Sequence, residues 1–382
     1  TKNNNSLFFA PNIYDLNIDL KNNNFNKQSE LEILMAGYVT EDRTLIKNIF
    51  QLEAGSFAIS PEKKIIDYYL HYPSKNLNVS SDIKLIKDID EILNNIFKNI
   101  YNKYADYKII VPLSGGLDSR LILGKLKEIG FNNITAISYG PKYNSEAKLA
   151  KIVAKKLNIP WLFLVSKKKI AKKLFYLEEF ANYLKYSCNY SRSPNMQEFH
   201  FLYDLSEKKI INKKTLIING QTGDFISGGH IPKSLILNPE SKENMIKYII
   251  DKHYSLWQNL RTGNNLDKII NLLNNYKSFE NINLLENKLN YAYMYNLWEW
   301  RERQSKFVIN QQKIYDFYNV YWELPLWNAQ FINFWRNLPL KHLENKKLYI
   351  KYLDHWNYKN IFLDKKINYT RLDRQEINRW PG

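Results

Sequence analysis

The chain has 382 residues, a formal net charge of +17 and one cysteine, Cys188. Its length allows two or three domains, and an aromatic content of 15% argues against an intrinsically disordered protein. A single cysteine excludes a disulfide framework or a cysteine zinc site within the chain, and no apolar run approaches the roughly 20 residues of a membrane span.

The basic excess is compatible with nucleic acid, an anionic membrane surface or anionic substrates. Genome composition explains it about as well, since the chain is rich in Lys, Asn, Ile and Tyr, whose codons are rich in A and T. The lysines are scattered without an RNA-binding signature, so we do not expect a nucleic-acid partner and leave peripheral membrane association open. Without a signal-peptide pattern we expect a cytoplasmic protein. The chain begins at Thr1 rather than Met, which leaves open whether upstream residues were removed.

Residues 1–78 predict a small, degenerate α/β cap. The run ELEILMAGY predicts a short helix that ends at Gly37. Alternation in FQLEAGSFAI predicts a hairpin with Gly55 at its turn, and KIIDYYLHY, residues 64–72, predicts a further strand.

From residue 79 to 382, strands and helices alternate. A helix is predicted over residues 83–104, before the apolar run YKIIVPL, which is typical of a buried parallel strand. Further strands are predicted at NITAISYG, WLFLV and KTLIING, with helices predicted over residues 120–130 and 145–159. This order predicts a doubly wound parallel sheet, followed by a helical C-terminal part because strand signals fade beyond about residue 240.

The loop SGGLDS lies between the first strand of this sheet and a helix, a context that favours a phosphate site over an ordinary turn. Glycines let the backbone approach a ligand, and hydroxyls with helix-start N–H groups can cradle an anion. Asp118 supplies a carboxylate that could bind Mg²⁺. No Gly-Lys-Ser/Thr follows, so this is not the Walker pattern. The anion-binding residues would be Ser114, Gly115, Gly116 and Ser119.

A second loop, NGQTGDFISGGH, follows the strand KTLIING and contains Asp224 among four glycines. Two strand ends in a parallel sheet face the same crevice, so Asp118 and Asp224 could share one Mg²⁺. The alternative is that Asp224 only caps a turn.

These motifs resemble the synthase domain of the asparagine synthetase family, a group of N-type ATP pyrophosphatases with an adenine nucleotide alpha hydrolase-like fold. The resemblance covers roughly residues 80–360. Matching segments are SGGLDS, ISYG followed by Glu146, NGQTGDFISGGH, Arg301 and Arg303 before Pro325-Leu326-Trp327-Asn328, and Lys347 with Lys351.

The resemblance implies ATP and Mg²⁺ as cofactors, adenylation of a carboxylate with release of pyrophosphate, and attack by ammonia or an amine. It implies that Asp118 and Asp224 hold Mg²⁺. Lys347 would stabilise charge in the transition state, and Gln221 would lie next to the acyl substrate. Arg301 and Arg303 could clamp a substrate carboxylate or a phosphate, or could lie on an exposed helix face. The adenosine would be lined by Leu113, Ser138, Gly140 and Gly220.

The sequence departs from the family's motifs at three positions that bear on the identity of the substrate. Gln221 replaces the Glu of asparagine synthetases, Phe225 replaces the acid after Asp224, and Asn328 replaces a late Asp. We therefore do not expect aspartate to be the substrate. His230 ends the second loop and is a candidate general base.

Residues 37–59 resemble the tail of the family's glutaminase domain, so the cap is interpreted as a remnant of that domain. Its cysteine nucleophile is missing, so we expect nitrogen from free ammonia, a partner glutaminase or an amine. The expected activity is that of an ATP-dependent amide-forming ligase, with a uronic acid of surface-polysaccharide biosynthesis as one candidate substrate. A tRNA-modifying enzyme with the same loop and a peptide cyclase of the lasso or β-lactam synthetase type remain alternatives.

Overall fold

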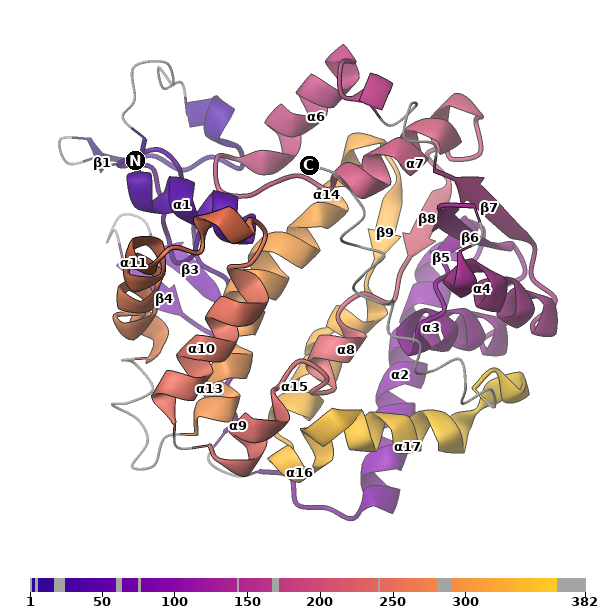
Figure 1. Ribbon diagram of the computed structural model, residues 1–382. Helices are drawn as coiled ribbons and strands as arrows, with labels where there is room; N and C mark the ends of the chain where they lie inside the picture. Colours follow the sequence, from indigo (N-terminus) through magenta and orange to yellow (C-terminus); the bar gives the residue numbers. More distant parts are fainter. Residues whose placement is uncertain are drawn as a thin grey trace.

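A five-stranded parallel sheet forms the centre of the protein (Figure 1). The computed structural model describes residues 2–3, 6–16, 25–59, 64–74, 77–142, 144–166, 172–239, 241–279 and 290–362. The strand order is β7-β6-β5-β8-β9, and every neighbouring pair is parallel. The strands are β5 (Lys108–Pro112), β6 (Ile134–Gly140), β7 (Trp161–Val165), β8 (Thr215–Ile218) and β9 (Tyr321–Glu323).

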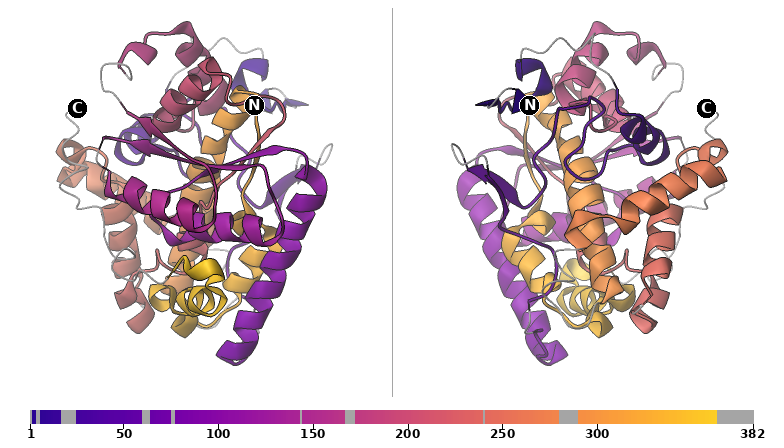
Figure 2. Two further views of the ribbon diagram at one scale, coloured as in Figure 1. Left: turned by 90° about the vertical axis from the view of Figure 1, so that its right-hand side faces the viewer. Right: turned by 90° about the vertical axis from the view of Figure 1, so that its left-hand side faces the viewer.

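Helices cover both faces of this sheet, as the two side views show (Figure 2). Ile109 and Val111 of β5 belong to the core that includes α2, α3 and α4, whereas Ile110 packs with α6, α7 and α14 on the other face. The alternation follows from the two-residue period of a strand. The prediction of a doubly wound sheet is therefore confirmed. The covering helices are α2 (Asp82–Tyr104), α3 (Leu117–Glu128), α4 (Ser145–Lys156), α6 (Glu178–Cys188), α7 (Met196–Glu207) and α14 (Lys313–Phe317).

The remaining elements are mostly helical, as expected for the C-terminal part. A nearly continuous helical run leads from residue 291 to 317 through α13, the π-helical η3, η4 and α14. The other α-helices are α1 (Lys27–Ala36), α8 (Gly223–Ile226), α9 (Lys233–Leu237), α10 (Lys242–His253), α11 (Gly263–Asn274), α13 (Tyr291–Trp298), α15 (Ala329–Arg336), α16 (Leu340–Leu343) and α17 (Lys347–Trp356). The π-helix is η3 (Glu299–Ile309). The 3-10 helices are η1 (Ile13–Leu16), η2 (Gln258–Leu260), η4 (Asn310–Gln312), η5 (Pro325–Trp327), η6 (Glu344–Lys346) and η7 (Tyr358–Asn360). The N-terminal strands are β1 (Lys2–Asn3), β2 (Ser6–Leu7), β3 (Ser56–Ile59) and β4 (Lys64–Asp67).

Two local predictions need correction. The strand β9 was not predicted, because its three residues lie in a region where strand signals fade and its pairing with β8 is long-range. The predicted hairpin around Gly55 is wrong, since β3 pairs antiparallel with β4. Gly55 instead precedes β3 with φ +77°, where an added Cβ would lie 2.2 Å from the carbonyl oxygen of Tyr69. By contrast, α1 ends at Gly37 as predicted, with a left-handed cap at φ 87°.

The cap lies against α10, α11 and the long helical run, away from β5, β6 and β7 (Figure 1). Met35, Ala36 and Tyr38 belong to the same core as α2 and α13. The division of the chain at residue 78 remains a prediction.

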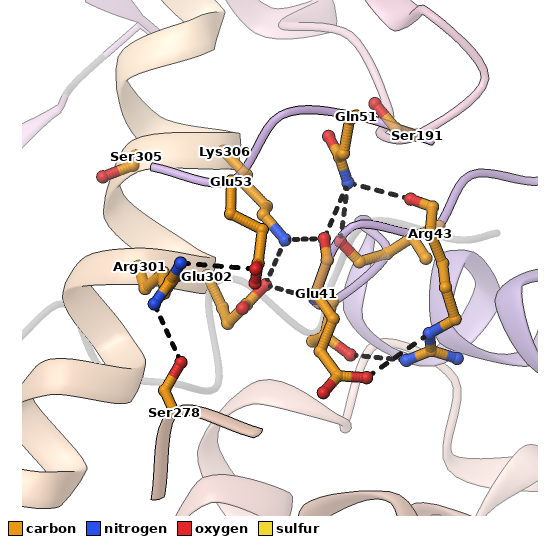
Figure 3. Close-up of polar contacts among 12 residues, drawn as sticks. Glu41, Arg43, Gln51, Glu53, Ser191, Ser278, Arg301, Glu302, Ser305 and Lys306 are labelled. Atoms are coloured by element: carbon orange, nitrogen blue, oxygen red, sulfur yellow. Dashed lines mark hydrogen bonds and ion pairs between the residues drawn. The ribbon is translucent and has the colours of Figure 1, made fainter. Parts of the chain in front are cut away.

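A polar cluster joins the cap to the long helical run, and its cations are paired with carboxylates (Figure 3). Arg301 lies 2.7 Å from Asp67, and Lys306 lies 2.6 Å from Glu302. Arg43 lies 3.0 Å from Glu32, a fully buried carboxylate that also accepts hydrogen bonds from Thr40 and from the Tyr254 hydroxyl. These pairs compensate charges that would otherwise be costly to bury.

The buried carboxyl group of Glu32 is expected to make the unfolding free energy depend on pH. Burial raises its pKa from 4.5 to about 7, against the opposing charge of Arg43. The folded state therefore binds the proton more tightly than the unfolded state, and this stabilisation is lost as the pH rises from about 4.5 through 7. Glu32→Gln keeps a hydrogen-bonding side chain and removes the titration. We expect the unfolding free energy of the variant, relative to the parent, to rise by up to about 3 kcal/mol across that range.

Thermal or urea unfolding between pH 5 and 8 measures this difference. Glu30→Gln is the matched control on the same helix, because Glu30 makes a partly exposed pair with Lys27 and should show a nearly flat profile. An equally flat difference for Glu32→Gln would contradict the titration of the buried carboxyl.

Candidate functional site

The loop after β5 is held by two serines. Ser114 Oγ lies 3.1 Å from Ser119 Oγ and accepts a hydrogen bond from the Gly116 N–H at 3.0 Å. The first helical residue is Leu117, and no side chain in the described part of the protein caps α3. A helix start without a side-chain cap leaves N–H groups that can bind an anion. The loop therefore has the shape and the donors that a phosphate requires.

The predicted adenosine residues lie at the carboxyl edge of β5 and β6. Leu113 and Ser138 are buried, and the Ser138 hydroxyl donates to the Leu113 carbonyl at 2.6 Å. The same hydroxyl accepts from Trp161 Nε1 at 3.0 Å, so its role in the structure is to tie β5, β6 and β7 together. Gly140 ends β6 with φ +145°, where a Cβ would lie 2.8 Å from Asn144 Nδ2. Contact with adenosine remains a prediction for these residues.

The two glycine-rich loops meet at Asp118. Asp118 Oδ2 accepts a hydrogen bond from the Asp224 N–H at 3.0 Å, and Oδ1 accepts from the Tyr349 hydroxyl at 2.7 Å. Gly220 and Gly223 make this approach possible, since a Cβ at either position would lie within 2.7 Å of an Asp118 atom. The structure thus brings Asp118, Gly220 and Asp224 together as the sequence predicted.

Gly223→Ala tests this approach. An added Cβ would lie 2.5 Å from Asp118 Cγ and 2.6 Å from Leu326 Cδ1, so the two loops would have to separate. We expect a loss of about 1–3 kcal/mol in unfolding free energy, with a fall in ATP-dependent turnover. Gly263→Ala is the control, because nothing lies within 4 Å of its Cβ position. Unchanged melting temperature and turnover for Gly223→Ala would show that the loops need not meet.

Asp224 is surrounded by cations. Lys346 Nζ lies 2.5 Å from its Oδ1, and His230 Nε2 lies 3.5 Å from its Oδ2. Although burial acts to raise its pKa, the His230 hydrogen bond and the Lys346 charge hold the pKa well below its usual range. Gly229 leaves room for this contact, since a Cβ there would lie 2.7 Å from Asp224 Oδ1 and 2.8 Å from Lys346 Cδ.

The lysine on Asp224 is therefore Lys346, whereas Lys347 is exposed at the start of α17. The charge of Lys347 acts on Asp82 at the start of α2, a residue that also pairs with Lys351. The left-handed backbone of Asn345 and Lys346, at φ 50° and 60°, sets this one-residue difference. A helix running smoothly into α17 would have placed the two side chains differently.

His230 is held between two carboxylates. Its Nδ1 contacts Glu299, which is fully buried and also lies 3.2 Å from Lys252. Burial acts to lower the pKa of His230, but the Glu299 charge and the Asp224 hydrogen bond raise it to about 9. An imidazole protonated at neutral pH cannot accept a proton, which argues against His230 as a general base.

Gln221 belongs to a chain of amides. Its Oε1 accepts from Gln312 Nε2 at 2.5 Å, and Gln312 Oε1 accepts from Asn219 Nδ2 at 2.8 Å. Thr222 follows with φ 76°, an uncommon conformation for a β-branched residue and a mark of local strain. The long helical run, through Gln312, thus fixes the side chain of Gln221 at the second loop.

Arg303 and Arg301 have other contacts. The Arg303 guanidinium lies 4.3 Å from the centroid of Phe307, and Arg301 is buried against Asp67 and Ser278. Neither makes a hydrogen bond or ion pair to the two glycine-rich loops within the described residues. A role for Arg303 at the acyl substrate remains a prediction.

Sequence reasoning missed several residues of the site. Tyr349 lies in the first turn of α17 and had no sequence signal of its own. Its contact with Asp118 depends on how η6 and α17 pack against the two loops. Glu299 and Gln312 belong to the long helical run, and at these two positions the sequence pattern indicates only a packed helix. The residues missed are Glu299, Gln312, Lys346 and Tyr349.

The site fits a hard divalent cation. No group of three or more His, Cys, Asp or Glu side chains able to hold a metal occurs in the described part of the chain. Asp118 and Asp224 supply oxygen donors of the kind that Mg²⁺ prefers. Burial, together with the Asp224 charge, raises the pKa of Asp118 to about 6, and neither of its hydrogen-bond partners is a cation. A cation that arrives with nucleotide phosphates would compensate this carboxylate.

Comparison with known proteins identifies the family. The family model described as asparagine synthase matches residues 102–347, more than half of the chain. No curated protein matches the chain significantly. Within the described residues, no helix is long and apolar enough to cross a lipid bilayer.

Similar solved structures include an NH3-dependent NAD synthetase from Campylobacter jejuni in complex with the nitrate ion. It is 14% identical, covers 60% of this chain and 96% of its own, and has a TM-score of 0.28. An NMN synthetase from Francisella tularensis is 15% identical, with 70% and 96% coverage and a TM-score of 0.26. Likeness at this level supports no inference about the substrate of this chain.

Proposed function

The chain belongs to the asparagine synthase family of ATP-dependent carbon–nitrogen ligases, and we propose that its two-loop site adenylates a carboxylate for attack by ammonia or an amine. The observation that carries this proposal is the contact between Asp118 and the backbone of Asp224. It places two carboxylate-bearing loops at the same edge of a parallel sheet, where such sheets bind their ligands.

The proposed reaction has two steps. A substrate carboxylate oxygen attacks the α-phosphorus of ATP, the bond to the β-bridging oxygen breaks, and pyrophosphate leaves. The amine nitrogen then attacks the acyl carbon, the carbon–oxygen bond to AMP breaks, and the nitrogen loses a proton to solvent. Both steps develop negative charge that a fixed cation stabilises.

In this proposal, residues of the two loops, of η6 and of α17 have separate roles in binding and catalysis. The loop from Ser114 to Ser119 binds phosphate oxygens through N–H and hydroxyl groups. Lys346 supplies the fixed cation, in place of the Lys347 expected from the sequence. Tyr349 and the Asp224 N–H orient the Asp118 carboxylate. Mg²⁺, held by Asp118 and Asp224 together with the phosphates, would neutralise the charge of the leaving pyrophosphate.

We further propose that the acid is a uronic acid, in a surface-polysaccharide pathway, rather than aspartate. The second loop carries an uncharged amide, that of Gln221, which the fully buried Gln312 holds in place. Such a group suits the hydroxyls of a sugar, whereas the ammonium group of aspartate favours a carboxylate partner. The net charge of +17 would also favour an anionic glycan substrate.

The nitrogen would come from free ammonia, a partner glutaminase or an amine cosubstrate. Incubation of the protein with ATP, Mg²⁺, ammonium and either galacturonate, glucuronate or aspartate tests the reaction, with nucleotides followed by phosphorus NMR. We expect AMP and pyrophosphate in equal amounts with a uronic acid. ADP and phosphate would contradict adenylation of a carboxylate, and turnover with aspartate alone would contradict the uronic acid. AMP formation that requires tRNA, with a steep dependence on salt, would instead support the RNA-modifying alternative.

A further inference from the structure

A cavity lies where the cap meets the long helical run and the segment after α6. Its volume is 470 Å³, within the range of small-molecule sites. It is lined by the N-terminal segment, by residues 189–192 and by the long helical run near Asn310. We call it the interface pocket. None of the described residues that line it is acidic.

Arg192 is a buried cation of the interface pocket, with 8% of its surface exposed. Backbone pairing of Tyr38 with Arg192 fixes its position against the cap. Its Nη1 donates to Ser191 Oγ at 3.3 Å, but its Nε is buried without a hydrogen-bond partner, and no carboxylate lies within ion-pair distance among the described residues. Burial lowers the pKa of Arg192 to about 10, as expected for a cation lacking a counter-charge.

Lys313 is the second cation of the interface pocket that forms no ion pair with a described carboxylate, and its Nζ lies 6.0 Å from the centroid of the Tyr186 ring. Lys313 is half-buried. Burial, reinforced by the charge of Arg192, lowers the pKa of Lys313. The charge of Arg192 disfavours the charged form of Lys313 and only the weaker charge of Asp316 opposes it, so an anion that contacts both cations would be stabilised.

In the neighbouring polar cluster, by contrast, the cations are paired with carboxylates. There Lys306 is directed toward Glu302 and the Glu41 carbonyl, and Arg301 toward Glu53 (Figure 3). Arg43, at the other end of the cluster, pairs with Glu32. Lys306 also lines the interface pocket and is paired with Glu302, whereas Arg192 and Lys313 form no ion pair with a carboxylate among the described residues.

Aromatic side chains also line the interface pocket. Phe8, Phe9 and Phe50 line it and are each more than half exposed. Aromatic rings with this exposure beside buried cations form a surface that suits a ligand with one charged and one apolar end.

We propose that the interface pocket binds a small organic anion, whose carboxylate or phosphate group contacts Arg192 and Lys313 and whose apolar part lies on Phe8, Phe9 and Phe50. Arg192 supplies a planar group with several donors, and Lys313 supplies a point charge. The site is separate from the two glycine-rich loops, so binding is expected without ATP. It adds a ligand site to the proposed ligase without depending on that activity.

Calorimetric titration of the full chain without ATP tests the proposal. The probes are hexanoate and hexyl phosphate, with hexanamide as the uncharged match and acetate and inorganic phosphate as anions without an apolar part. We expect at least one hexyl anion to bind about tenfold more tightly than hexanamide and the two small anions. Whichever of hexanoate and hexyl phosphate binds more tightly shows whether the pocket prefers a carboxylate or a phosphate group.

Lys313→Met removes the half-buried charge while keeping side-chain length, and it should weaken binding of that anion about tenfold. Lys155→Met is the control, since Lys155 is exposed on α4 and is not part of the pocket. Melting curves show whether each variant is folded. Equal binding of hexanoate, hexyl phosphate and hexanamide, absence of saturable binding, or equal effects of the two lysine variants would each overturn the proposal.

Discussion

Asp118→Asn should abolish ATP-dependent formation of AMP and pyrophosphate, with a loss of turnover of at least about 10³-fold. The substitution keeps the size of the side chain but removes the charge that would face the cation and phosphates. It also presents an amide N–H₂ toward either the Tyr349 hydroxyl or the Asp224 N–H, both of which donate to Asp118 in the structure. The variant therefore loses the carboxylate charge and one of the two hydrogen bonds that orient the side chain of residue 118.

Asp90→Asn is the matched control for this variant. Asp90 also accepts a hydrogen bond from a tyrosine hydroxyl, that of Tyr352 at 3.0 Å, and pairs with Lys125 at 2.8 Å, but it lies on α2 outside the two loops. We expect it to lower the melting temperature and leave turnover per folded molecule nearly unchanged. Turnover of Asp118→Asn equal to that of Asp90→Asn would remove Asp118 from the site. Nucleotide binding, measured in parallel, distinguishes loss of binding from loss of chemistry.

The sequence predicted the parts of the fold that have a local signal. Buried strands such as YKIIVPL and the amphipathic α2 have periodicities that burial dictates, and the loops after β5 and β8 carry glycines where Asp118 and Asp224 approach. Their meeting followed from the rule that parallel strands end at one edge. The strand β9 could not be predicted, because its pairing with β8 depends on contacts across about a hundred residues.

The side chains of the site were harder to predict than its backbone. Arg301 reads like a ligand-binding residue, yet it pairs with Asp67 of the cap, a partner more than two hundred positions away. The pKa of His230 depends on Glu299, which no local pattern joins to it. Buried pairing of this kind is set by tertiary packing, so a motif can indicate which loop matters and still leave the protonation state of its residues open.

The assignment of the catalytic lysine depends on one residue of register. Lys346→Met should reduce turnover by about 10²–10³-fold, because it removes the cation from Asp224 and from the phosphates. Lys347→Met should change turnover less than about threefold, since Lys347 is exposed and its charge acts on Asp82. Both variants replace a lysine with methionine, and they differ only in which way the substituted side chain points.

Steady-state kinetics of both variants, with AMP release as the readout, measures the difference. Lys346→Met should lower kcat more than it raises KM, because a charge that stabilises the transition state contributes less to ground-state binding. Loss of activity on Lys347→Met with normal turnover of Lys346→Met would mean that α17 changes register when ATP binds. In that case the left-handed pair Asn345 and Lys346 would be the hinge, because these two residues of η6 directly precede the regular helix of α17.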